Sequence, residues 1–132
     1  MRSALGRGHV SLLYVMVGGA VGSGARYLTG RAMTALLGTG YPFGTLAVNL
    51  VGGLLMGVLV GVLARNAAPE GWRLLVGVGV LGGFTTFSSF SLDVVTMAER
   101  GAPGLALGYI LVSVIGSIAA LFAGLSAVRA VA

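Results

Sequence analysis

The sequence predicts an all-α membrane protein with four transmembrane helices, and three observations support this prediction. Hydrophobic residues make up 57% of the chain and charged residues only 8%, whereas a soluble domain is normally about a quarter charged. Charged residues are absent from 10–25, 32–64, 74–92 and 101–128, and two of these runs exceed the roughly 20 residues of a spanning helix. Three turn-forming segments interrupt the apolar sequence. We therefore expect residues 1–132 to form a single membrane domain.

The first span is expected over residues 10–28, with Arg26 and Arg31 near its end. Basic residues precede it, as in a secretory signal peptide, but no small-residue cleavage site with a polar mature region follows. We therefore expect this segment to remain as the first transmembrane helix.

Turn signals separate the other three spans. Residues 38–42 read Gly-Thr-Gly-Tyr-Pro, and the proline suits the first turn of the next helix. A polar loop follows at 65–71, after which Trp72 is an aromatic residue suited to the membrane interface. A third loop lies at 99–103. The expected spans are residues 42–64, 72–98 and 104–128.

The third span differs from the others in its middle. Residues 82–90 contain two adjacent glycines and four hydroxyl residues at membrane depth. Irregular backbone within a bilayer is tolerated only where protein or a cavity surrounds it, and in transporters such breaks mark ion sites. We expect helix three to be broken mid-span, with a harmless kink as the alternative.

Two sets of polar residues in the spans are candidate functional groups. Asn49 has apolar neighbours, and a buried carboxamide needs hydrogen-bond partners. It serves either to join helices or to donate to a permeating ion. Tyr109, Ser113 and Ser117 recur every four residues, so their hydroxyls share one helix face; hydrogen bonding between helices is their alternative role.

Two charged residues allow more than one interpretation. Arg26 lies among small residues and is either a structural tether or a ligand contact. Asp93 follows the polar stretch by one turn, and an intramembrane acid is a candidate for proton coupling. Because Asp93 lies near Glu99 and Arg100, a position near the helix end is favoured.

Several other functions lack the residues that they need. The chain has no cysteine, so disulfides and thiolate chemistry are excluded. His9 has no partner at ligand spacing, and the serines lack a buried histidine base. Residues 77–82 match G-x-G-x-x-G, but inside an apolar run without a βαβ unit. Eight scattered arginines form no basic patch, so we expect neither an enzyme nor a nucleic-acid partner.

Three motifs resemble those of the CrcB/Fluc fluoride channels, small four-helix proteins that export fluoride. They are GGAVGSGARY at residues 18–27, PFGTLAVN at 42–49 and GGFTTFSSF at 82–90. The resemblance covers essentially the whole chain with the motifs in the same order. Ser89, where many relatives carry threonine, is a conservative difference.

The resemblance implies an antiparallel, dual-topology homodimer in the cell membrane, in which a second, inverted copy completes two narrow fluoride pores. By resemblance, Asn49 lines the pore as a donor, and the ring edges of Phe87 and Phe90 face the ion. Ser113 and Ser117 match a track of hydroxyls on helix four, with Tyr109 beside it.

The resemblance also implies one structural sodium ion at the dimer interface. By resemblance, the backbone carbonyls of Gly82 and Thr85 hold this ion, and Arg26 matches the arginine of helix one. Fluoride, the lipid bilayer and the second copy are the implied partners.

Two alternatives belong to other functional classes. Small proton-coupled multidrug exporters are also four-helix, dual-topology dimers, but they need a carboxylate deep in helix one, and residues 10–25 contain none. An assembly subunit without transport activity would not need polar residues on three spans.

The distribution of arginines bears on how the chain inserts. With four spans, both termini and the loop at 65–73 share one side of the membrane. That side carries five arginines and the other three, a small difference for the charge bias that sets orientation. The five are Arg2, Arg7, Arg65, Arg73 and Arg129, and the three are Arg26, Arg31 and Arg100.

Overall fold

The computed structural model describes the backbone of residues 2–131 and the side chains of residues 8–131. Within this part of the chain no strand occurs, and four helical spans are long and apolar enough to cross a membrane. The protein is therefore a multi-pass membrane protein. Arg2 and Arg7, which enter the arginine count, lie outside the described side chains. The spans are Gly8–Leu37, Phe43–Asn66, Glu70–Glu99 and Pro103–Ala130.

Helix α1 (Arg2–Leu37) extends beyond both ends of the expected span of residues 10–28. The two arginines expected near its end lie within it, because a long arginine side chain reaches a polar boundary without interrupting the helical backbone. The helix ends where Gly38 adopts a φ of 80°. The Gly38 amide donates to the Thr34 carbonyl over 2.9 Å, so a left-handed glycine terminates α1.

Helices α2 (Phe43–Asn66) and α6 (Pro103–Ala130) form the most extensive helix pair of the fold. Both begin and end within two residues of their expected bounds. A Cβ atom on Gly57 would lie 2.1 Å from a backbone carbonyl oxygen of α6, so small residues permit this close approach. Near one end, Arg65 Nη1 donates to the Val128 carbonyl over 3.0 Å.

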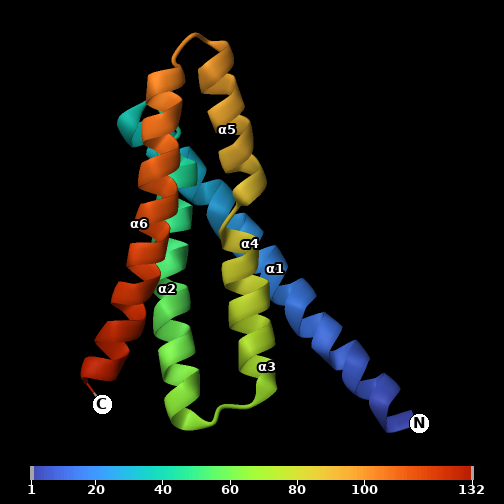
Figure 1. The fold of residues 1–132 in the computed structure, drawn as a ribbon. Coiled ribbons are helices and arrows are strands. Elements are labelled where there is room, and N and C mark those ends of the chain that lie inside the picture. The colour runs from blue at the N-terminus through green and yellow to red at the C-terminus, as the bar shows by residue number, and fades with distance from the viewer. Residues whose placement is uncertain (1, 132) are drawn as a thin grey trace.

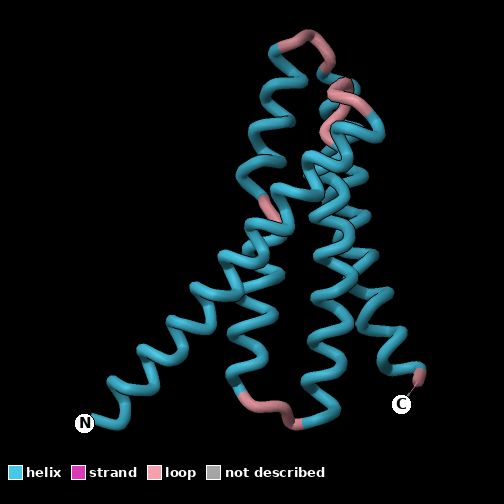
Figure 2. The backbone as a smooth tube through the Cα atoms, turned by 180° about the vertical axis from the view of Figure 1, so that it is seen from behind, coloured by secondary structure: helices cyan, strands magenta, loops and turns pink. Residues whose placement is uncertain are grey.

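The third span, expected at residues 72–98, consists of four helical pieces. The piece η1 is a π-helix, whose wider i→i+5 turns no sequence pattern indicated. The glycine pair is itself helical, and the backbone leaves the helical conformation after it, at residues 85–86. Figure 2 shows this short non-helical segment within the span. The pieces are α3 (Glu70–Trp72), η1 (Arg73–Leu81), α4 (Gly82–Phe84) and α5 (Phe87–Glu99).

The two halves of the third span pack against different neighbours. The pieces η1 and α4 lie along α1, where a Cβ atom on Gly18 would lie 2.9 Å from Gly79 Cα. Helix α5 instead packs on α6. In Figure 1 α1 runs obliquely across the junction of the two halves, and both termini lie at the same end of the molecule. The buried cluster under α5 consists of Phe90, Met97, Ala106 and Tyr109.

Large apolar side chains cover the outside of the helices. Examples are Leu36 on α1 and Ile115 and Phe122 on α6, all of them exposed. Soluble monomers rarely expose continuous apolar surface of this extent. The outer surface is therefore suited to lipid or to another apolar protein surface.

Candidate functional site

The backbone of Thr85 and Thr86 is extended, with φ/ψ of −79°/156° and −152°/119°. The Thr85 hydroxyl donates back to the Leu81 carbonyl over 2.9 Å and so caps the first half of the span. Thr86 Oγ1 accepts from the Ser89 amide over 3.2 Å and so caps the start of α5. The Leu81 carbonyl also accepts from the Thr85 amide over 3.0 Å, so the Thr85 hydroxyl is its second donor. Thr86 satisfies an amide at a helix start, where an apolar medium offers no water as a substitute partner.

Asn49 on α2 forms two hydrogen bonds with the backbone of Thr86. The Thr86 amide donates to Asn49 Oδ1 over 2.8 Å, and Asn49 Nδ2 donates to the Thr86 carbonyl over 3.0 Å. Thr86 is only 8% exposed, so these bonds satisfy polar groups that water does not reach freely. The carboxamide joins α2 to the third span, and one of its two N–H donors is left over.

These hydrogen bonds affect two backbone carbonyls. In a continuous α-helix the Gly82 carbonyl would accept from the Thr86 amide, and the Thr85 carbonyl from the Ser89 amide. Here the Thr86 amide donates to Asn49, and the Ser89 amide donates to the Thr86 hydroxyl. The Gly82 and Thr85 carbonyls are therefore separated from the donors that a helix would give them.

A cavity of about 430 Å³ lies between this segment, α2 and α6. Ser113 is 5% exposed, and its buried hydroxyl has no hydrogen-bond partner among the described residues. A buried hydroxyl without a partner is unusual and indicates a place for a polar ligand. Of the expected pore residues, those that line the cavity are Asn49, Phe87, Phe90, Ser113 and Ser117.

The two phenylalanines differ in their surroundings. Their ring centroids are 5.4 Å apart, with the planes at 47°. Phe90 is 7% exposed and its centroid lies 5.3 Å from that of Tyr109, whereas Phe87 is 76% exposed at the open side of the cavity. Tyr109 is fully buried behind Phe90 and does not line the cavity.

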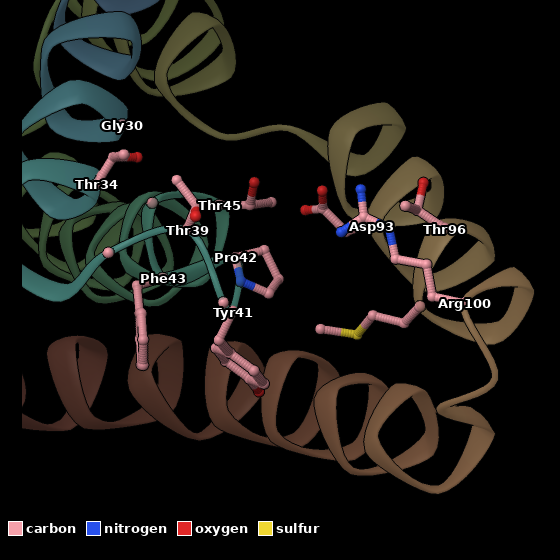
Figure 3. A pocket seen from close by; sticks show the side chains of 14 residues that line it. Gly30, Thr34, Thr39, Tyr41, Pro42, Phe43, Thr45, Asp93, Thr96 and Arg100 are labelled. Atoms are coloured by element: carbon pink, nitrogen blue, oxygen red, sulfur yellow. The ribbon is translucent and has the colours of Figure 1, made fainter.

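Asp93 lies on α5, the last piece of the third span, and that span ends six residues later at Glu99, consistent with the position near the helix end that the sequence favoured. The Tyr109 hydroxyl donates to Asp93 Oδ2 over 3.1 Å. Asp93 lines a second cavity of about 380 Å³, together with the turn at residues 38–43. Figure 3 shows its carboxylate facing Thr45 across this space. At the same turn, partial burial raises the pKa of Tyr41 above its usual value.

Arg26 is half-buried on α1 and lies apart from the phenylalanines. It lines a third cavity, of about 300 Å³, whose wall also includes Thr45, Thr86 and Ser89. Thr86 thus lies between the cavity beside Arg26 and the cavity beside Phe87. The structure brings Arg26 close to the extended segment but not to Ser113 or Ser117.

Thr86 is the central residue that the sequence did not single out. Its backbone bonds to Asn49, and its hydroxyl also contacts the hydroxyls of Ser88 and Ser89 at 3.3 and 3.2 Å. A threonine just before a helical segment is a typical N-cap residue, and this signal is present in the sequence. The pairing with Asn49, 37 residues away, has no such signal.

Comparisons with known proteins agree on one family. A family model described as "CrcB-like protein, Camphor Resistance (CrcB)" matches residues 13–125. A protein of Caulobacter vibrioides is 55% identical over 122 residues, covering 91% of this chain and 96% of its own. One of Agrobacterium fabrum is 56% identical over 119 residues, covering 89% and 94%. One of Mesorhizobium japonicum is 52% identical over 115 residues, covering 87% and 93%. Each is called fluoride-specific ion channel FluC.

Proposed function

Because this chain belongs to the CrcB-like family, we propose that it is a channel, not an enzyme, and that it lets fluoride leave the cytoplasm passively across the cell membrane. The cavity beside the extended segment is the observation that supports this proposal most directly. It combines an amide donor at Asn49, hydroxyls at Ser113 and Ser117 and the rings of Phe87 and Phe90. Among the described residues, no charged side chain lines it.

Neutral donors suit a permeating anion. Fluoride is strongly hydrated, so a selective path must replace its water, yet binding must stay weak enough for the ion to leave. The free N–H of Asn49 and the unpartnered Ser113 hydroxyl supply such donors. The ring edges of Phe87 and Phe90 carry the positive part of the aromatic quadrupole. Hydrofluoric acid enters cells as a neutral weak acid and dissociates, and the channel releases the trapped anion.

A second, inverted copy completes the pores in this proposal. Phe87 is largely exposed at the open side of the cavity, so one chain alone leaves the path without a wall there. The apolar outer surface offers area for pairing, and a two-fold pair makes a self-complementary interface. The small arginine bias lets copies insert in both orientations.

One sodium ion at the dimer interface is the remaining part of the proposal. The carbonyls of Gly82 and Thr85 suit it, because both are separated from their helical donors and oxygen is the ligand that hard cations prefer. Two oxygens from one chain are few for such an ion, and the second copy would supply the same pair. When bound, the ion supplies fixed positive charge that holds the two copies together.

Liposomes containing only the purified protein should lose fluoride quickly and chloride hardly at all. The reason is that the neutral donors of the narrow path can replace the water around a small anion but not around a larger one. A fluoride electrode records the efflux, with protein-free liposomes as the control. Equal fluoride and chloride rates would contradict the proposal, and a strict requirement for a proton gradient would favour a proton-coupled exporter instead.

A cysteine added at the C-terminus should be labelled from both sides of the membrane, about half from each. The chain has no natural cysteine, so the signal reports this position alone. Membrane-impermeant maleimide applied to intact and to opened cells measures it. Labelling from one side only, in a protein that still conducts by itself, would exclude the inverted homodimer.

A further inference from the structure

The carbonyls of Gly82 and Thr85 can bind a cation only if no amide N–H occupies them. We propose that Asn49 and Thr86 are positioning residues for the cation site: each captures one amide N–H that would otherwise return to a carbonyl of that site. Asn49 captures the Thr86 amide, and the Thr86 hydroxyl captures the Ser89 amide. This inference rests on the sodium site of the proposed function.

The carboxamide of Asn49 is suited to hold its place. Both its oxygen and its nitrogen bond to the same residue, Thr86, over 2.8 and 3.0 Å, which fixes the orientation of the group. Without Asn49 the buried Thr86 amide would lack a partner, which is costly in an apolar medium. The nearest backbone alternative along the helix is the Gly82 carbonyl, and this bond would close the helix over the cation ligand.

The hydroxyl of Thr86 has the same effect one turn later. It accepts from the Ser89 amide over 3.2 Å and keeps that donor from the Thr85 carbonyl. Valine has nearly the shape of threonine but no oxygen to accept this bond. Removing the hydroxyl would therefore return the Ser89 amide to the Thr85 carbonyl, while serine would keep the capture.

Helix α2 packs against the extended segment, residues 85–86, at a second point. A Cβ atom on Gly52 would lie 2.2 Å from Thr85 Cγ2. Gly52 follows Asn49 by three residues, so both face the segment from neighbouring turns of α2. Because Asn49 also keeps one N–H for the cavity, a single side chain serves both the fluoride path and the cation site.

The sodium dependence of thermal stability in the intact dimer tests this inference. The parent should melt about 5 °C or more higher in sodium chloride than in N-methylglucamine chloride, because ligand binding stabilises the folded state. Thr86→Val should lose this difference, and Thr86→Ser should keep it. Each variant is compared with itself in the two salts, so a general destabilisation by valine would not by itself remove the difference in melting temperature.

A second pair keeps the test decisive if Thr86→Val does not fold. Asn49→Leu removes both hydrogen bonds and should lose the sodium difference. Asn49→Asp retains an oxygen for the Thr86 amide and should keep the sodium difference even though its fluoride flux falls. Ser117→Ala, which changes the same cavity without touching the segment, should also keep the difference.

A full sodium difference in either Thr86→Val or Asn49→Leu would overturn the inference. Absence of the difference in the parent would overturn both the inference and the sodium site. Fluoride efflux of the parent, measured on the same preparation, judges the channel proposal separately.

Discussion

Asn49→Asp should reduce fluoride efflux by about a hundredfold or more. The substitution replaces an N–H donor with a carboxylate in the wall of the proposed fluoride path. Two like charges about 4 Å apart repel by roughly 4 kcal/mol at an effective dielectric constant of about 20, and about 1.4 kcal/mol corresponds to a factor of ten. One carboxylate oxygen still accepts from the Thr86 amide, but the bond to the Thr86 carbonyl is lost, because an ionised carboxylate has no hydrogen to donate.

Ser117→Ala is the matched control for this substitution. It removes one neutral hydroxyl from the same cavity and should reduce efflux by about tenfold or less, the size of one hydrogen bond. Initial rates from fluoride-loaded liposomes at equal protein content measure both variants. Asn49→Asp conducting like the parent would show that the ion does not pass this side chain.

Phe87→Ile and Phe90→Ile should each reduce fluoride efflux by about two- to tenfold. Isoleucine keeps most of the apolar bulk but removes the polarised ring edge, and an aromatic edge contact contributes roughly 0.5–1.5 kcal/mol. The two rings contact each other with centroids 5.4 Å apart, so losing either one also frees the other to move. Efflux from liposomes, with chloride efflux as the selectivity measure, checks the result.

The two substitutions should differ in stability. Phe90 is buried between Phe87 and Tyr109, so Phe90→Ile should destabilise the fold by about 1–3 kcal/mol through imperfect repacking. Phe87→Ile should have less effect on the isolated chain. Phe122→Ile, at an exposed position on α6 away from the cavities, is the control and should leave efflux unchanged. A fall in efflux for Phe122→Ile equal to the others would show a non-specific effect of losing a ring.

The four spans could be predicted from the sequence because charge depletion over 20 or more residues leaves few alternatives to membrane insertion. The residues at which the helices end were less predictable where the end depends on the backbone conformation of a single residue. The first helix continues past its arginines and ends only before Gly38, whose φ of 80° interrupts the helical hydrogen-bond pattern. No residue pattern in the sequence distinguishes the π-helical piece η1, which packs against α1, from an ordinary α-helix.

The candidate site could be predicted as a set of residue types but not as a network. An asparagine in an apolar span signals that a partner exists, yet only the folded chain shows that the partner is the Thr86 backbone. Asp93 illustrates the same limit, because its partner Tyr109 lies on another helix. Neighbouring charges indicated its place near the helix end, but only the packing of α5 on α6 shows the surroundings of this carboxylate.

The division of the third span between two sets of neighbours also has a consequence for biogenesis. Helix α1 and the η1–α4 half can pack once residues up to 84 have reached the membrane, whereas α2 and α5 meet their main partner, α6, only when the last span has followed. A helix whose main partner has not yet been made leaves apolar surface uncovered until then. The newly made protein therefore passes through a stage in which α1 is already packed while α2 still lacks its main neighbour. A chain truncated before residue 103 would remain in this state, with an uncovered face on α2.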